Sequence, residues 1–252
     1  GNKISCFTKD ARHFQIMALG SLLTLLVIWG DFAPSLEIIG LTMATALWTQ
    51  WGLSMYFGVK PDFRSPFITS LSLCLLFRAG EIWLFPLAAI IGISSKFLIR
   101  YDGKHLFNPA NIAIVSLLLL FPQDVWVSPE QWGTDLLLVF ALLCLSFLML
   151  FLVHKRDVVV FFMGIYAALT LIRSLSVGDP MEIPFHQLQS GALLIFTFFM
   201  ISDPKTTPNH IMGRFLFALS IAAIGFIMHF QFQVREGLFY ALALVCLATP
   251  FI

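Results

Sequence analysis

Two short polar segments interrupt a chain that is otherwise dominated by hydrocarbon side chains. Their candidate ligand-contacting residues are Lys104, His105, Asn108, Asn111, Ser202, Asp203, Thr206 and Thr207. Asn108 can cap a helix that begins at Pro109, and the free amide groups of such a helix start attract an anion such as a phosphate. Amide, hydroxyl and carboxylate groups can also hydrogen-bond the edge of a bound small molecule. We therefore predict a binding site here if the two segments meet in the fold.

A purely structural role for the same residues stays open. Asp203 before Pro204 is typical of a helix stop, and Thr207-Pro208-Asn209 is typical of a turn into the next apolar segment. Asn108 can serve as a helix cap and nothing more. Arg214 follows closely in the sequence and can pair with Asp203, in which case the turn needs no ligand.

No other residue pattern indicates catalysis or metal binding. The four cysteines stand alone without a C-x-x-C pair, which favours packing thiols over metal ligands. No histidine spacing suggests a metal site or a haem pair. The sequence also lacks a nucleophile with a base at helical spacing, a phosphate-cradling glycine loop and a dinucleotide fingerprint. We predict no catalytic residue and no metal in this chain.

The elements that must position the polar segments are membrane helices. Hydrophobic residues make up 59% of the 252 residues and charged residues 12%, against roughly 45–50% and about 25% in soluble domains. This composition indicates an integral membrane protein in contact with the lipid bilayer. A formal net charge of +1 gives no support to nucleic-acid binding, which needs a basic face.

The chain divides into ten apolar segments, which cover residues 14–30, 36–56, 67–79, 82–99, 106–121, 135–153, 158–175, 185–201, 211–229 and 237–252. A perpendicular membrane span needs about 20 residues, so a pair among segments three to five can be broken or re-entrant. Arg78 and Glu81 are three residues apart, and we expect them to share one helix face and to pair.

The basic residues orient this ten-span arrangement. If the N-terminus is cytoplasmic, twelve Lys and Arg lie on the cytoplasmic side and three lie outside, which follows the positive-inside rule. Both termini are therefore predicted to be cytoplasmic. Ten spans also divide into two halves of five, which run inverted to each other, and Pro66-Phe67 recurs as Pro184-Phe185. We predict an all-α polytopic membrane protein, a single transmembrane domain over 1–252 with pseudo-repeats over about 1–123 and 133–252.

Both polar segments carry a resemblance to one family. The run from Ser190-Gly191-Ala192 to Ser202-Asp203-Pro204-Lys205-Thr206-Thr207-Pro208, followed by Gly213-Arg214, resembles the C-terminal part of a family of membrane subunits. That family comprises NqrB of the sodium-translocating NADH:quinone reductase and RnfD of the Rnf electron-transport complex. Gly103–Ala110 is similar to its other signature, Gly-Lys-x-x-Phe-Asn-Pro-Ala. The resemblance covers most of the chain from about residue 12.

The resemblance implies a ten-helix subunit of the bacterial inner membrane that holds flavin and relays electrons, with an ion movement coupled to the transfer. No soluble cofactor domain is visible in this sequence, so electron transfer requires other membrane or redox subunits as partners. Any enzymatic activity would then belong to an oxidoreductase or translocase complex of which this chain is one subunit.

The family attaches an FMN through its phosphate to a Thr in a Ser-Gly-Ala-Thr motif, and this sequence departs from that motif. Ser190-Gly191-Ala192 continues into Leu193, so we predict no covalent FMN. A noncovalent flavin, riboflavin or FMN, remains, with Asn108, Asn111, Thr206 and Thr207 as partners for the ring edge. The alternatives are a transporter or channel for a small polar solute on the same helical scaffold, and a structural membrane anchor of a larger assembly.

Overall fold

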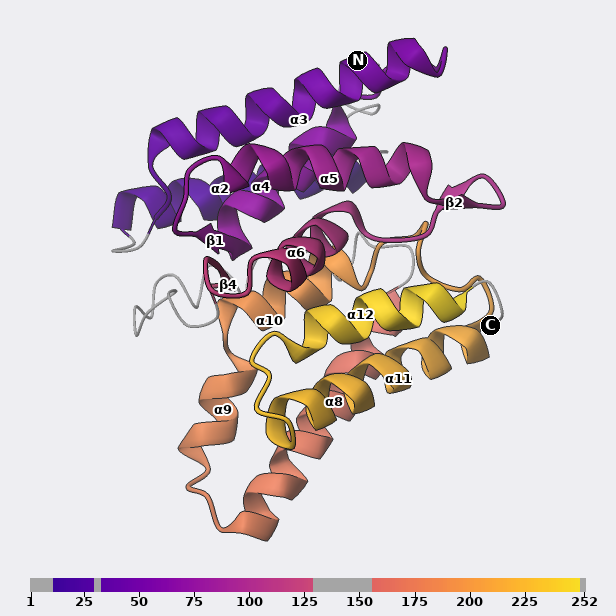
Figure 1. Cartoon of the computed structure of the whole chain (residues 1–252). Coiled ribbons are helices and arrows are strands. Elements are labelled where there is room, and N and C mark those ends of the chain that lie inside the picture. Colours follow the sequence, from indigo (N-terminus) through magenta and orange to yellow (C-terminus); the bar gives the residue numbers. More distant parts are fainter. Residues whose placement is uncertain (1–10, 30–32, 129–155, 250–252) are drawn as a thin grey trace, which may run out of the picture.

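The computed structural model describes residues 11–29, 33–128 and 156–249, and these are mostly helical (Figure 1). In the N-terminal part the helices are α2 (Ala11–Trp29), α3 (Leu36–Tyr56), α4 (Arg64–Leu76), α5 (Leu84–Leu98) and α6 (Pro109–Leu120). The C-terminal part contains α8 (Arg156–Val177), α9 (Glu182–Leu188), α10 (Gly191–Ile195), the π-helix η1 (Phe196–Met200), α11 (Ile211–Phe230) and α12 (Gly237–Ala248).

These helices follow the apolar segments predicted from the sequence, with one segment broken in two. Predicted segment 185–201 is divided between α9 and the continuous pair α10–η1, which are bent by 44°. The bend falls at Ser190, whose hydroxyl accepts a hydrogen bond from the Leu193 amide and so caps α10. Predicted segment 135–153 lies outside the described residues, as does the end of segment 237–252.

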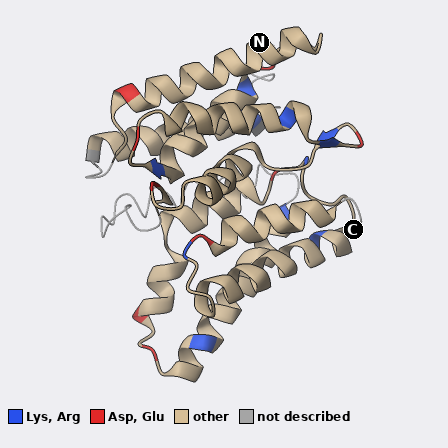
Figure 2. Cartoon of the chain, viewed as in Figure 1, with Lys and Arg blue, Asp and Glu red and all other residues tan. Residues whose placement is uncertain are grey.

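By length and composition, α8 and α11 can each cross a membrane, and α9 with α10–η1 is a third candidate. The helices α4, α6 and α12 have 13, 12 and 12 residues. At about 1.5 Å per residue they fall well short of the ~30 Å hydrocarbon core. Charged residues are few along the helices and mostly occur toward helix ends and connections (Figure 2). The chain is therefore a helical membrane protein in which several helices are shorter than a full span.

Two short antiparallel ribbons add to the predicted all-α fold. Strand β1 (Phe77–Ala79) pairs with β4 (Val125–Val127), with Phe77 opposite Val127. Strands β2 (Arg100–Tyr101) and β3 (Lys104–His105) form a hairpin before α6. β1 directly follows the short helix α4, and β4 comes a few residues after the end of α6. Pairing the two strands satisfies backbone groups that lipid cannot satisfy.

The expected pair of Arg78 with Glu81 on one helix face is wrong. The helix ends at Leu76, and Arg78 lies in β1, where its buried Nη1 donates to the carbonyls of Cys74 and Phe77 at 2.8 Å each. Glu81 is exposed. The guanidinium thus satisfies carbonyls at the end of α4 and does not pair with Glu81.

Among the described helices, two sets of three pack in a similar way. In the N-terminal group α5 lies between α3 and α6, and in the C-terminal group α11 lies between α8 and α12. In Figure 1 the first group occupies the top of the view and the second the bottom, and they meet where α6 packs against α12. Gly92 brings α5 close to the start of α6, because a Cβ there would lie 2.7 Å from the Pro109 carbonyl oxygen.

Candidate functional site

The two polar segments meet at the carboxylate of Asp203. His105 Nε2 lies 3.2 Å from Asp203 Oδ2, and Asn108 Nδ2 donates to the same oxygen at 3.4 Å. The side chains of His105 and Asp203 are only 10% and 16% exposed. The two segments therefore meet, which was the condition for a site here, although they are almost a hundred residues apart in the sequence.

The local sequence determines the backbone conformation of the first polar segment, which contains His105 and Asn108. Asp102 and Gly103 both have positive φ, 47° and 74°, and form the tight turn between β2 and β3. Asn108 caps α6 by accepting a hydrogen bond from the Asn111 amide at 3.1 Å, and Pro109 occupies the first helical position. The Asn108 side chain therefore has its oxygen committed to the helix and its amide nitrogen free to reach Asp203.

The second segment follows η1, whose five residues are all buried. A π-helix widens the last turn, and such turns are frequent at functional sites. Ser202 donates its hydroxyl to the Phe198 carbonyl at 2.5 Å. Beyond it, the backbone carbonyl of Asp203 accepts from the amides and the hydroxyls of both Thr206 and Thr207. The turn is thus organised around Asp203 and holds its carboxylate in place.

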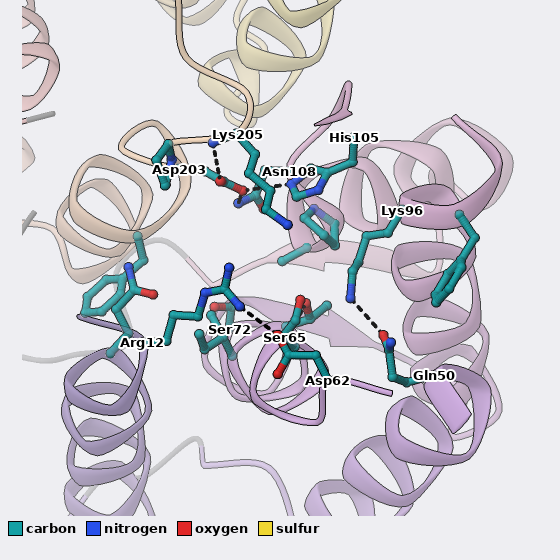
Figure 3. A pocket seen from close by; sticks show the side chains of 18 of the residues that line it. Arg12, Gln50, Asp62, Ser65, Ser72, Lys96, His105, Asn108, Asp203 and Lys205 are labelled. Atoms are coloured by element: carbon teal, nitrogen blue, oxygen red, sulfur yellow. Dashed lines mark hydrogen bonds and ion pairs between the residues drawn. The ribbon is translucent and has the colours of Figure 1, made fainter. Parts of the chain in front are cut away.

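A cavity of about 710 Å3 lies beside this meeting point (Figure 3). Helices α2 to α6 and the turn after η1 all contribute to its wall. Apolar wall residues include Ile68, Phe97 and Phe199, whereas most of the remaining wall is polar or charged. The volume falls in the range of about 300–1,000 Å3 that small-molecule sites occupy.

The cavity has two carboxylates, and both are engaged by cationic side chains or amide donors. Asp62 Oδ2 lies 2.6 Å from Arg12 Nη1, and its Oδ1 lies 3.1 Å from Arg64 Nε. Burial raises the pKa of Asp62, but the hydrogen bonds and charge of Arg64 and the charge of Arg12 outweigh it, so this pKa lies below its ordinary value.

The pKa of Asp203 is lowered in the same way. Burial alone would raise the pKa of Asp203. The hydrogen bond and charge of His105, together with the backbone N–H and the charge of Lys205, lower this pKa by more than burial raises it. Asp203 is therefore a carboxylate at neutral pH, and its negative charge is held by neighbouring donors.

The C-terminal half of the chain is similar to known proteins. Residues 130–252 match the NQR2, RnfD, RnfE family. The chain is also 36% identical over 75 residues to the subunit designated D of the proton-translocating ferredoxin:NAD(+) oxidoreductase complex of Clostridium ljungdahlii. The resemblance to the NQR2, RnfD, RnfE family is confirmed.

A second relative, the subunit designated D of the ion-translocating oxidoreductase complex of Pseudomonas paraeruginosa, is 29% identical over 87 residues. The two aligned stretches cover 30% and 34% of this chain and only 22% and 25% of the relatives. The NQR2, RnfD, RnfE match includes the turn at Asp203 but not the segment from Lys104 to Asn111.

Of the eight residues predicted from the sequence, four line the cavity: His105, Asn108, Ser202 and Asp203. Thr206 and Thr207 are buried and hold the turn from behind. Lys104 is exposed on the hairpin. Asn111 is buried against α12, where its Nδ2 donates to the Phe239 carbonyl at 3.2 Å and its Oδ1 has no partner in the described part of the chain. The last four side chains do not line the cavity.

The predicted pair of Arg214 with Asp203 is wrong. Arg214 Nε lies 2.6 Å from Asp157 Oδ2, so this ion pair joins α11 to the start of α8. Asp203 faces His105 and the cavity instead. The prediction relied on the short distance between the two residues in the sequence. It was wrong because the turn and the helix that follows it direct their side chains to different neighbours.

Sequence reasoning missed the wall that α2 to α5 supply. Ser65, Thr69 and Ser72 line the cavity from α4, and their spacing of four and three residues places them on one helix face. Gln50 of α3 and Lys96 of α5 meet across the wall, with Lys96 Nζ donating to Gln50 Oε1 at 2.8 Å. The polar stripe on α4 and a lone Gln inside an apolar segment were the available signals.

No metal centre is formed by the described residues, since nowhere in 11–29, 33–128 and 156–249 do three His, Cys, Asp or Glu side chains gather. Cys74 and Cys246 are buried free thiols.

Proposed function

We propose that this chain is a membrane subunit of an ion-translocating electron-transport complex and that it binds a flavin, without a covalent bond, in the cavity beside Asp203. The observation that carries the proposal is the meeting of the Asn108 and Asp203 segments at one wall of a cavity of about 710 Å3. The resemblance to the NQR2, RnfD, RnfE family supports the same assignment.

The residues present fit a flavin. An isoalloxazine ring needs apolar contacts on its faces and a few hydrogen-bond partners at its edge. Phe97, Phe199 and Ile68 provide apolar wall, and Asn108, Ser202 and Asp203 bring polar groups to the same cavity. Asn111, Thr206 and Thr207 would act behind this wall, by fixing α6 and the turn.

The structural role of Ser190-Gly191-Ala192 agrees with noncovalent binding. Ser190 caps α10, and Leu193 stands where the motif would need a Thr. The chain thus lacks at this position the hydroxyl that would form the phosphoester bond.

A bound flavin would supply the capacity to accept and donate electrons, and the chain's own residues would bind and orient it. The contacts of His105 and Asn108 with Asp203 fix one wall of the cavity. Because that wall is largely buried, its dipoles and charges act more strongly on a ligand than they would in water. Electron donor and acceptor would be partner subunits, with ion movement coupled to the transfer.

The proposed topology has ten spans in two inverted five-helix repeats, over about 1–123 and 133–252, with both termini in the cytoplasm of a bacterial inner membrane. The similar packing of α3–α5–α6 and α8–α11–α12 supports it. The bent pair α9 and α10–η1 would correspond to the interrupted segment α4–β1.

Titration of the purified protein with FMN and riboflavin, followed by quenching of flavin fluorescence, tests the proposal. We expect saturable binding that Ser65→Trp abolishes by filling the cavity, because Ser65 lines its wall. Ser176→Trp is the matched control on the exposed end of α8. Binding that survives Ser65→Trp, or no binding at all, contradicts the proposal. In the second case, uptake of small polar solutes into proteoliposomes would test the transporter alternative.

A further inference from the structure

The charges around the cavity do not balance. Five basic side chains line it: Arg12, Lys60, Lys96, Arg100 and Lys205. The carboxylates of the wall are Asp62 and Asp203. Asp62 is engaged by Arg12 and Arg64, and Asp203 is engaged by His105 and Asn108. Neither carboxylate forms a direct ion pair with Lys60, Lys96, Arg100 or Lys205 in the described residues.

Lys96 and Lys205 are two of the cavity's basic side chains that have no carboxylate within ion-pair distance in the described residues. Lys96 Nζ donates to a neutral acceptor, Gln50 Oε1, which leaves two of its N–H groups available, and Asp62 and Asp203 act on its charge only from beyond ion-pair distance. Across the described residues, no carboxylate oxygen lies within 4.0 Å of either ammonium nitrogen. Figure 3 shows both side chains pointing into the cavity from different walls. Their like charges act on each other across it.

Lys96 is partly buried and Lys205 is exposed. Two like charges that face one cavity repel each other, and an anion bound between them turns that repulsion into attraction. A phosphate monoester carries about −1.5 to −2 charges at neutral pH, and lysine binds such groups as a compact point charge. Riboflavin has no such group, whereas FMN ends in one.

We propose that Lys96 and Lys205 form a phosphate subsite within the cavity, so that the flavin it takes is FMN rather than riboflavin. The inference rests on the proposed function for the identity of the ligand. The same two lysines would also hold a free phosphate, which has the same chemistry, and the experiment separates these sources.

The test compares the dissociation constants of FMN and riboflavin for the purified protein in detergent, by fluorescence quenching. We expect FMN to bind about a hundredfold more tightly, about tenfold for each lysine, since each tenfold corresponds to about 1.4 kcal/mol. Lys96→Gln and Lys205→Gln should each weaken FMN binding about tenfold and leave riboflavin within about twofold. Inorganic phosphate should compete with FMN and not with riboflavin.

Arg235→Gln is the control for loss of one positive charge, because Arg235 is exposed in the connection between α11 and α12 and does not line the cavity. Lys96→Arg and Lys205→Arg keep the charge and should retain at least part of the preference for FMN. Thermal unfolding of every variant shows whether the fold is intact.

The outcomes separate the two proposals. Equal affinities for FMN and riboflavin, or lysine variants that weaken both flavins alike, overturn the phosphate subsite and leave the proposed function standing. Stabilisation by inorganic phosphate that needs both lysines, with no flavin binding, supports the subsite and overturns the flavin assignment. No binding of flavin or phosphate overturns both.

Discussion

The carboxylate side of the cavity, formed by His105, Asn108 and Asp203, differs from its lysine side, formed by Lys96 and Lys205. On the carboxylate side, Asp203 Oδ2 is met by His105 and Asn108, and Oδ1 accepts the Lys205 amide at 3.0 Å. On the lysine side, positive charge faces a neutral Gln50 and open cavity. The carboxylate side is complete without a ligand and should chiefly hold the fold, whereas the lysine side has donors left over and should chiefly bind.

Removal of both lysine charges should give the largest effect. In Lys96→Gln/Lys205→Gln we expect FMN affinity to fall about a hundredfold, to the level of riboflavin, because the phosphate loses both of its charged donors. The dissociation constants of the two flavins are the measurement. A double variant that still prefers FMN would contradict the assignment of the lysine side to binding.

Loss of the carboxylate should act mainly on stability. Asp203→Ala leaves the largely buried His105 and Asn108 without their shared acceptor, and we expect the free energy of unfolding to fall by about 1–3 kcal/mol. Thermal or denaturant unfolding in detergent measures it. Asp203→Asn keeps an acceptor oxygen and should lose less. If Asp203→Ala is as stable as the wild type, the carboxylate side does not hold the fold.

Acidification should lower the stability of the fold by protonating the Asp203 carboxylate. The folded pKa of Asp203 lies below its ordinary value of 3.8. Its contribution to stability is therefore complete above that value and is lost as the pH falls through the lower folded pKa. Unfolding temperatures from about pH 5 to about pH 3 should show the difference between wild type and Asp203→Asn shrinking with acid. A difference that grows instead would contradict the sign.

The smallest effect should come from Lys104, which the sequence grouped with the binding residues and the structure exposes on the hairpin. We expect Lys104→Gln to change FMN and riboflavin affinity by no more than about twofold. The titration used for Lys96→Gln provides the direct comparison. A loss as large as that of Lys96→Gln would mean that the hairpin closes over the cavity.

Much of the fold could be predicted because composition and hydrophobic length determine where membrane helices lie. The starts of α3, α11 and α12 agree with the predicted segments at 36, 211 and 237. The ribbon of β1 with β4 could not be predicted, because it depends on two helices ending short of a span and on partners about fifty residues apart. The ten-span topology and the cytoplasmic termini stay predictions.

The candidate site was predictable only in part, for a related reason. Asn108 and Asp203 were recognisable because polar residues stand out at the ends of apolar segments. Gln50 and Lys96 are separated by 46 residues, and only packing of α3 against α5 brings them to one cavity. The error over Arg214 has the same origin, since its true partner Asp157 lies 57 residues away.

The most direct test of the central claim, a noncovalent flavin in this cavity, is the absorption spectrum of the purified protein before and after denaturation and filtration. We expect flavin bands in the native protein and their complete transfer to the filtrate on denaturation, where the released compound elutes as FMN. A colourless protein that also fails to bind added FMN or riboflavin, or a flavin that stays with the denatured chain, would contradict this account.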